Sequence, residues 1–159
     1  MSGVQEEFLR KACDAAAAAC HIFPEYAACE AALESAWGLS HLAARANNLF
    51  GQKQSHPAHE GTETISLPTR EYLHGAWTTV PASWIVFASW QSCFEKRMKL
   101  LHTLESAHPH YTAALKAKNG EEFVTEVSKS WSTDPQRAGK VLSIYDHHQA
   151  VFVHPAQAA

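Results

Sequence analysis

The sequence lacks any long apolar run and any large cluster of basic residues. Its longest apolar stretches, AAAAAC and WIVFA, fall far short of the roughly 20 apolar residues that a membrane-spanning helix needs. Lysine and arginine gather only in the short KAK and EKRMK stretches, and the formal net charge is -3. A surface that follows nucleic-acid phosphates needs a basic patch. We therefore expect a chain that neither spans a membrane nor binds nucleic acid.

Motifs for metal binding and for paired cysteines are also lacking. Cys13, Cys20, Cys29 and Cys93 form no CxxC spacing, and all lie in segments predicted to be helical. We expect free, mostly buried thiols, with a disulfide between the first two helices as the alternative. The 11 histidines are scattered, and none forms the same-face pair of a zinc-binding helix. We predict no metal and no other cofactor.

What the sequence does contain is helical periodicity with one interruption. A chain of 159 residues, 46% hydrophobic, suffices for one domain with a core. Between Gln54 and Val80 the stretches TETISL, TREYL and WTTV alternate like short strands, and WIVFAS follows as a returning strand. We predict a single α+β domain, mainly α, over residues 1–159, with a helical body and a small β-hairpin lobe at about 54–88.

Several residues mark helix boundaries. Pro24 suits the first turn of a helix that Gly38 ends. The other predicted boundaries are an end of the first helix near Cys20, a cap at Ser40 for a helix through Arg45, a new helix at Ser89, a stop and start at Asn119-Gly120, and a cap at Asp134-Pro135.

Residues 32–53, ALESAWGLSHLAARANNLFGQK, place Glu34 on a helix of small residues. The charge of Glu30, one turn away, and partial burial both favour a carboxylic acid that keeps its proton, and such an acid can protonate a leaving group. The alternative is that Glu25, Glu30 and Glu34 form a solvated helix face. Spacing alone does not separate the two.

The same stretch resembles the signature of the glucosaminidase family of peptidoglycan hydrolases, which includes bacterial autolysins and the flagellar muramidase domain. In this family a helix with a glutamate leads to an Asn-Leu-Phe-Gly segment that lines the sugar groove. The resemblance implies a lysozyme-like fold with a substrate cleft, Glu34 as the catalytic acid, and Asn48 and Phe50 as substrate-binding residues. The matching positions are Ser35, Trp37, Gly38, Asn48, Leu49, Phe50 and Gly51.

The stretch TREYLHG, residues 69–75, is similar to the family's hairpin motif, which implies that Glu71 is the second carboxylate and that Tyr72 binds substrate. An acid and a second carboxylate suffice to cleave a glycosidic bond, and their separation decides between retention and inversion. Glu63 is the first rival of Glu71, and Glu60 comes behind it, since a register shift of one residue turns a side chain away from the cleft.

The stretch WSTDPQRAGKVLSIY, residues 131–145, resembles the family's closing motif, with two departures. Trp131 stands where the family has a tyrosine, and an indole keeps the capacity to stack on a sugar. Any step that needs a phenolic hydroxyl must then use Tyr72, Tyr111 or water instead, or be absent. Gln136-Arg137 replaces the family's Asn-Tyr, which we interpret as a surface change with little mechanistic weight.

The resemblance implies a hydrolase that cleaves the β-1,4 bonds of peptidoglycan, foremost as an N-acetylglucosaminidase. The alternatives are a lytic transglycosylase or an N-acetylmuramidase that uses Glu34 alone, and a non-catalytic cell-wall-binding module. Lytic transglycosylases usually follow the glutamate with Gly-Leu-Met-Gln, whereas this chain has NNLFGQ.

The N-terminal stretch carries acidic residues where a secretion signal has basic ones. We therefore expect the chain to reach the cell wall, in the periplasm or outside the cell, without a classical signal peptide, either by release as in a phage endolysin or by another export route. We expect it to act as a monomer. Its expected partner is the glycan strand of peptidoglycan.

Overall fold

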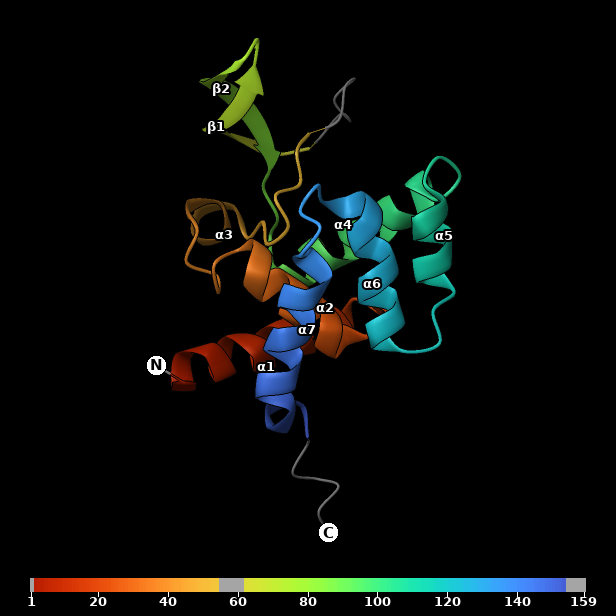
Figure 1. The fold of residues 1–159 in the computed structure, drawn as a ribbon. Helices are drawn as coiled ribbons and strands as arrows, with labels where there is room; N and C mark the ends of the chain where they lie inside the picture. Colours follow the sequence, from red (N-terminus) through yellow and green to blue (C-terminus); the bar gives the residue numbers. More distant parts are fainter. Residues whose placement is uncertain (1, 55–61, 154–159) are drawn as a thin grey trace.

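A computed structural model of the chain describes residues 2–54 and 62–153. The elements are α1 (Ser2–Ala18), α2 (Pro24–Glu34), α3 (His41–Ala46), β1 (Thr64–Leu73), β2 (Ala76–Ile85), α4 (Trp90–Leu104), α5 (Pro109–Leu115), α6 (Gly120–Trp131), α7 (Arg137–His148) and the 3-10 helix η1 (Gln149–Phe152). The helices form one body, and the two strands form a hairpin that stands out from one end of it (Figure 1). The predicted α+β class, mainly α with a small β-hairpin lobe, is confirmed.

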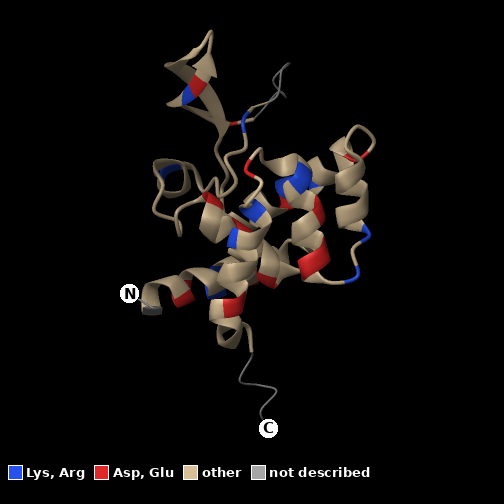
Figure 2. Ribbon diagram, in the orientation of Figure 1, with Lys and Arg blue, Asp and Glu red and all other residues tan. Residues whose placement is uncertain are grey.

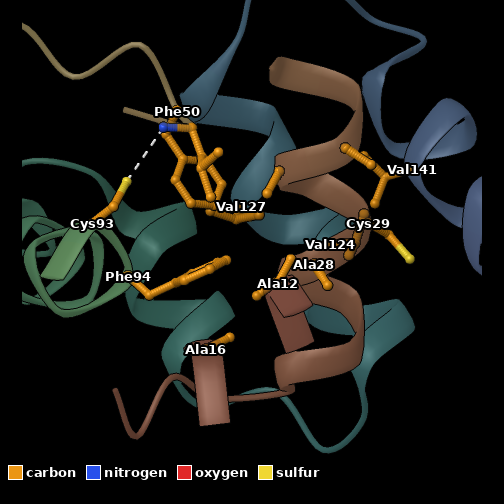
Figure 3. Packing of buried hydrophobic residues seen from close by; sticks show 14 of the residues in the cluster. Ala12, Ala16, Ala28, Cys29, Phe50, Cys93, Phe94, Val124, Val127 and Val141 are labelled. Carbon is orange, nitrogen blue, oxygen red and sulfur yellow. Dashed lines mark hydrogen bonds between the residues drawn. The ribbon is translucent and has the colours of Figure 1, made fainter. Parts of the chain in front are cut away.

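Helix α2 lies among the other helices of the body because one side of it carries only small side chains. Helices α1, α6 and α7 all pack against it. Phe94 of α4 and Val124 and Val127 of α6 pack in the core near it (Figure 3). The fully buried small residues of α2 are Ala27, Ala28, Cys29, Ala31 and Ala32.

Three predicted helix starts have the expected caps. The side-chain oxygens of Ser40, Ser89 and Asn119 each accept a hydrogen bond from the backbone N–H three residues later, at 3.1, 3.1 and 2.8 Å. Pro24 stands in the first turn of α2, as predicted.

Three other boundaries differ from the prediction. Helix α1 ends at Ala18 because Cys20 adopts a left-handed backbone with φ 55°. Helix α2 ends at Glu34, four residues before Gly38. Helix α7 begins at Arg137, because the carboxylate of Asp134 accepts a hydrogen bond from the N–H of Gln136 at 2.9 Å and forms a turn of its own before the helix.

The hairpin consists of two strands of ten residues each, where the sequence predicted several shorter ones. Pro68 lies opposite Pro81, and both are tolerated because each strand of a two-stranded sheet has a free edge. His74 and Gly75, with φ 50° and 81°, form the two-residue turn. Only the first residues of WIVFAS belong to β2, and Phe87 beyond it is buried in the body.

All four cysteines are free, as predicted, and no disulfide joins α1 to α2 in the described chain. Cys29 and Cys93 are buried, but Cys13 is half-buried and Cys20 is exposed, so the prediction of mostly buried thiols is wrong for these last two cysteines. Burial raises the pKa of the Cys93 thiol to about 11, so this side chain remains a protonated, weakly polar core residue. Among the described residues, no helix has the length and apolar character needed to cross a membrane.

Candidate active site

Glu34 is the last residue of α2, and the chain turns sharply after it. The hydroxyl of Ser35 donates to the carbonyl oxygen of Ala31 at 2.6 Å and accepts from the N–H of Gly38 at 2.8 Å. Residues 36–38 all adopt left-handed backbone, with φ of 50°, 59° and 79°. Such a conformation costs energy in residues other than glycine and is concentrated at functional sites. The turn leaves the Glu34 side chain 20% exposed at the end of a buried helix.

Arg137, at the start of α7, binds Glu34 directly. Its Nε donates to Oε1 of Glu34 at 2.9 Å, and its Nη2 lies 2.8 Å from the same oxygen. Oε2 accepts no hydrogen bond from the described residues. The Arg137 side chain is only 2% exposed. The interpretation of Gln136-Arg137 as a surface change is therefore wrong for Arg137, whose guanidinium points inward to the predicted acid.

Glu30, one turn before Glu34, is fully buried between two arginines. Arg97 of α4 donates to both of its oxygens at 2.7 Å, and Nη2 of Arg137 donates to Oε2 at 2.8 Å. Burial alone would raise the pKa of Glu30, but the two guanidinium charges outweigh it and lower the pKa to about 2. Glu30 is thus neither part of a solvated face nor an unpaired like charge beside Glu34, and both sequence interpretations of it are wrong.

His21 extends this network to the loop after α1. Burial and the charge of Arg97 lower the pKa of His21 to about 4, so the ring is neutral. Its Nδ1 lies 2.7 Å from the carbonyl oxygen of the next residue and donates to it, which leaves Nε2 to accept from Arg97 at 3.2 Å. An unbroken series of polar contacts therefore runs from His21 through Arg97, Glu30 and Arg137 to Glu34. Figure 2 shows acidic and basic residues side by side in the middle of the helical body.

Aromatic rings enclose the guanidinium of Arg97. It lies 4.5 Å from the centroid of the Phe50 ring and 4.6 Å from that of Trp131. Such contacts stabilise a buried cation. Phe50 and Tyr111 are both about 4% exposed, whereas Trp131 is half-buried. The structure therefore places two of the predicted substrate-binding residues, Phe50 and Trp131, against Arg97, with Tyr111 at a ring distance of 6.4 Å from Trp131, and of the three only the indole is partly accessible.

Glu71 lies on the hairpin and makes a separate ion pair. The alternating burial of β1 places it on the partly covered face of the strand, and its Oε1 lies 3.2 Å from Nζ of Lys53. Among the described residues, no hydrogen bond or ion pair joins Glu71 to Glu34. Glu63 is exposed just before β1, where its carbonyl oxygen accepts from the N–H of Val86 at 2.9 Å. Glu60 lies outside the described residues.

The Glucosaminidase family model, described as mannosyl-glycoprotein endo-beta-N-acetylglucosaminidase, matches residues 10–150. The chain belongs to the glucosaminidase family. The resemblance that the sequence motifs predicted is confirmed.

Individual relatives agree with this assignment. The chain is 31% identical over 130 residues to the exo-glucosaminidase LytG of Bacillus subtilis, a match that covers 80% of this chain and 45% of LytG. It is 25% identical over 142 residues to a protein of Lactococcus lactis subsp. cremoris named probable N-acetylmuramidase, covering 87% of this chain and 32% of that protein. The chain thus spans less than half the length of these curated relatives.

Among solved structures, the catalytic domain of the autolysin Auto from Listeria monocytogenes is similar to this chain with a TM-score of 0.80 and 25% identity. The match covers 93% of this chain and 86% of that domain.

Asn48, in the glucosaminidase motif, lies at the joint between hairpin and body. Its side chain is 1% exposed. Its amide nitrogen donates to the carbonyl oxygens of Gln52 and Ile85 at 2.9 and 3.0 Å, and its Oδ1 accepts from the N–H of Gln52 at 2.9 Å. Asn47 adds a hydrogen bond to the carbonyl oxygen of Phe87 at 3.0 Å. The amide of Asn48 is therefore engaged inside the protein, and this geometry favours a structural role over the predicted contact with substrate.

The exposed aromatic residues of this glucosaminidase chain lie in two places. Trp131 borders an open hollow of about 750 Å³ that Ser132, Thr133 and Pro135 also line. Tyr72 and Trp77 are paired across the hairpin at a ring distance of 5.6 Å, and both are more than 60% exposed. Because neighbouring residues of a strand point to opposite faces, Tyr72 projects from the face opposite to Glu71.

Sequence reasoning missed Arg97 and His21 as parts of the site. A signal for Arg97 was available, because it stands between Phe94 and Leu101 at the spacing of the buried face of α4. An arginine at a core position requires a partner. Among the described residues, no group of three or more histidine, cysteine, aspartate or glutamate side chains is arranged to hold a metal ion.

Proposed function

We propose that this domain hydrolyses the β-1,4 glycosidic bonds of the peptidoglycan glycan strand as an N-acetylglucosaminidase, with Glu34 as the general acid. Membership of the glucosaminidase family and the named activity of LytG support the choice of substrate and bond. The observation that carries the proposal is the setting of Glu34. One carboxylate oxygen is fixed by Arg137, and the other is unbonded in a side chain that solvent reaches.

The acid step follows from this arrangement. A glycosidic oxygen leaves readily only if it gains a proton as its bond to the sugar breaks. In this proposal Glu34 acts when it is protonated on Oε2, the oxygen that Arg137 leaves free; the proton passes to the leaving oxygen, and Glu34 becomes a carboxylate paired with Arg137. The positive charge that develops on the sugar ring then needs a carboxylate on its other side, or water that a carboxylate activates.

Glu71 is our first choice for this second carboxylate. It reaches the substrate when the glycan strand draws the hairpin toward the body and Glu71 leaves Lys53. Glu63, nearer the base of the hairpin, is the second choice, and Glu60 is the third. A carboxylate separation of about 5–5.5 Å in the closed state corresponds to retention, and about 6.5–9.5 Å corresponds to inversion.

Substrate contacts outside the acid come from the exposed aromatic residues. The Trp131 indole borders a hollow wide enough for a sugar ring, and stacking on indole suits the apolar face of a sugar. Tyr72 projects from the hairpin face opposite to Glu71, so it would contact the glycan strand only beyond the bond that is cleaved. Phe50 packs against Arg97, Tyr111 packs near Trp131, and Asn48 holds the base of the hairpin.

A single-acid reaction is the second candidate. It is favoured by the separation of the two carboxylates, since Glu34 pairs with Arg137 and Glu71 pairs with Lys53. Of the two carboxylates in the buried network, Glu30 and Glu34, solvent reaches Glu34. A lytic transglycosylase and an N-acetylmuramidase would both use Glu34 in this way, and the relatives from Lactococcus are named for the second activity.

The domain organisation, the assembly state and the location are also part of the proposal. We infer one catalytic domain that acts as a monomer on peptidoglycan outside the cytoplasmic membrane. The family match over residues 10–150 supports a single domain, and the relatives named for wall-degrading activities support the location.

The deciding test is digestion of purified peptidoglycan with mass spectrometry of the released sugars. We expect Glu34→Gln to be inactive, Glu71→Gln to be strongly impaired, and the products to carry reducing N-acetylglucosamine ends. Glu121→Gln, an exposed residue on α6, is the matched control. Anhydro ends, or full activity of Glu71→Gln, Glu63→Gln and Glu60→Gln alike, would establish single-acid chemistry. Full activity of Glu34→Gln would refute the proposal.

A further inference from the structure

Two other residues hold the Arg137 guanidinium besides Glu34. Its Nη1 donates to the hydroxyl of Ser128 on α6 at 2.8 Å, and its Nη2 donates to Oε2 of Glu30 at 2.8 Å. With a side chain that is 2% exposed, the guanidinium has no room for another orientation without breaking these bonds. Its Nε and Nη2 therefore meet Glu34 in one fixed geometry.

Glu30 does not depend on Arg137 for its pairing. Arg97 alone donates to both Glu30 oxygens at 2.7 Å, which is the two-pronged geometry that satisfies a carboxylate. The contacts of Arg137 with Glu34 are thus an addition to a pair that is already complete. This separates a role at Glu34 from a role in packing the core.

Both contacts of Arg137 with Glu34 use the same oxygen. Binding at Oε1 turns the carboxylate so that Oε2 stays unbonded by the described residues. A carboxylic acid that acts as a general acid needs one oxygen free to approach the leaving group, and its side chain must be held in the orientation that allows this approach.

We propose that Arg137 is a positioning residue that fixes the carboxylate of Glu34 by Oε1 and keeps Oε2 available for the glycosidic oxygen. This inference rests on the proposed function of Glu34 as the acid. It gives the departure from the family's closing motif a mechanistic meaning, because an arginine fork replaces the tyrosine expected at this position.

The charged groups near Glu34 come from three helices. Glu30 lies on α2 one turn before Glu34, Arg97 of α4 pairs with Glu30, and Arg137 of α7 contacts both carboxylates. Among these, Arg137 is the cation in direct contact with the acid.

The test compares Arg137→Gln and Arg137→Lys with the wild type, measuring kcat and KM on a soluble peptidoglycan fragment. We expect Arg137→Gln to lower kcat about 100-fold, because misplacement of a reacting group by about 1 Å costs that much. KM should change less than about twofold, since binding contacts made equally in ground and transition state are kept. A large loss in kcat beside a small change in KM is the readout that a purely structural role would not produce.

Arg137→Lys keeps the charge but loses the fork, so it should show an intermediate kcat with the wild-type KM. Lys140→Gln removes an exposed cation one turn further along α7 and serves as the control. Wild-type kcat in folded Arg137→Gln would overturn the inference. If that variant does not fold, wild-type kcat in Arg137→Lys would overturn it instead. Loss of activity in Glu34→Gln beside full activity in the Arg137 variants refutes the positioning role alone, whereas an active Glu34→Gln refutes the proposed function.

Discussion

The two predicted carboxylates lie in opposite kinds of surroundings. Glu34 is on the helical body, where Arg137 holds it and Glu30, Arg97 and His21 continue the contacts through the buried interior. Glu71 is on a two-stranded hairpin, and its partner Lys53 is 49% exposed. Buried pairs are rigid and sensitive to any missing partner, whereas exposed pairs are weak and easily exchanged. The comparison teaches that the body holds Glu34 in one orientation, whereas the exposed pair on the hairpin is readily exchanged, which is what the proposed function requires of a second carboxylate.

Removal of Arg97 should destabilise the buried network around Glu30 more than any other change proposed below. Arg97→Met keeps an apolar stem between Phe50 and Trp131 but leaves Glu30 buried with Arg137 as its only remaining cation. Breaking a buried pair by removing one partner costs about 3–5 kcal/mol. We expect a loss of this size in the free energy of unfolding, measured by urea denaturation. A loss below about 1 kcal/mol would mean that water reaches Glu30.

Asn48 joins the two regions, and its removal should uncouple them. Asn48→Ala deletes three hydrogen bonds and leaves buried partners at Gln52 and Ile85, which costs about 3 kcal/mol in all. Hydrogen exchange should become faster in residues 83–87 and 52–54, while the centre of α2 keeps its protection. Unchanged exchange at the base of the hairpin would contradict a role of Asn48 as the joint.

Acid should weaken the body through His21. The folded pKa of His21 is about 4 and its ordinary value is 6.5, so between these pH values the unfolded chain binds more protons than the folded one. The stability contributed by the neutral ring is complete above pH 6.5 and is lost as the pH falls toward 4. We expect the free energy of unfolding to drop by about 2 kcal/mol between pH 7.5 and 5.

His21→Gln is the control for this pH effect, because an amide can keep a polar contact with Arg97 without titrating. Its stability should change much less over the same range. Glu30, whose pKa is lowered to about 2 from 4.5, adds its own loss only below pH 4.5. Equal losses in the wild type and His21→Gln would show that another group is responsible.

The sequence predicted the architecture and the family and named Glu34 as the candidate acid, but it did not predict the residues that hold Glu34. Caps such as Ser40 and Asn119 act locally, so a few neighbouring residues determine them. The long motif around Glu34 made the family evident. The direction of the Arg137 side chain depends on the residue at which α7 starts. The turn at Asp134 moves that start further along the chain, and local sequence rules do not predict the exact first residue of a helix. The partners of Arg137 lie at positions 30, 34 and 128, and only the assembled helices bring them together.

The smallest expected effect on stability is at the exposed ion pair between Glu71 and Lys53. Lys53→Met removes the partner of Glu71 and should change the free energy of unfolding by less than about 1 kcal/mol, since exposed pairs contribute little. If Glu71 must leave Lys53 to reach the substrate, the variant should hydrolyse peptidoglycan at least as fast as the wild type. Its rate should also depend less on salt, because salt screens the pair that the wild type has to break. A large loss of activity in Lys53→Met would instead show that the ion pair holds Glu71 in its working position, and the hairpin would then act as a fixed wall of the cleft.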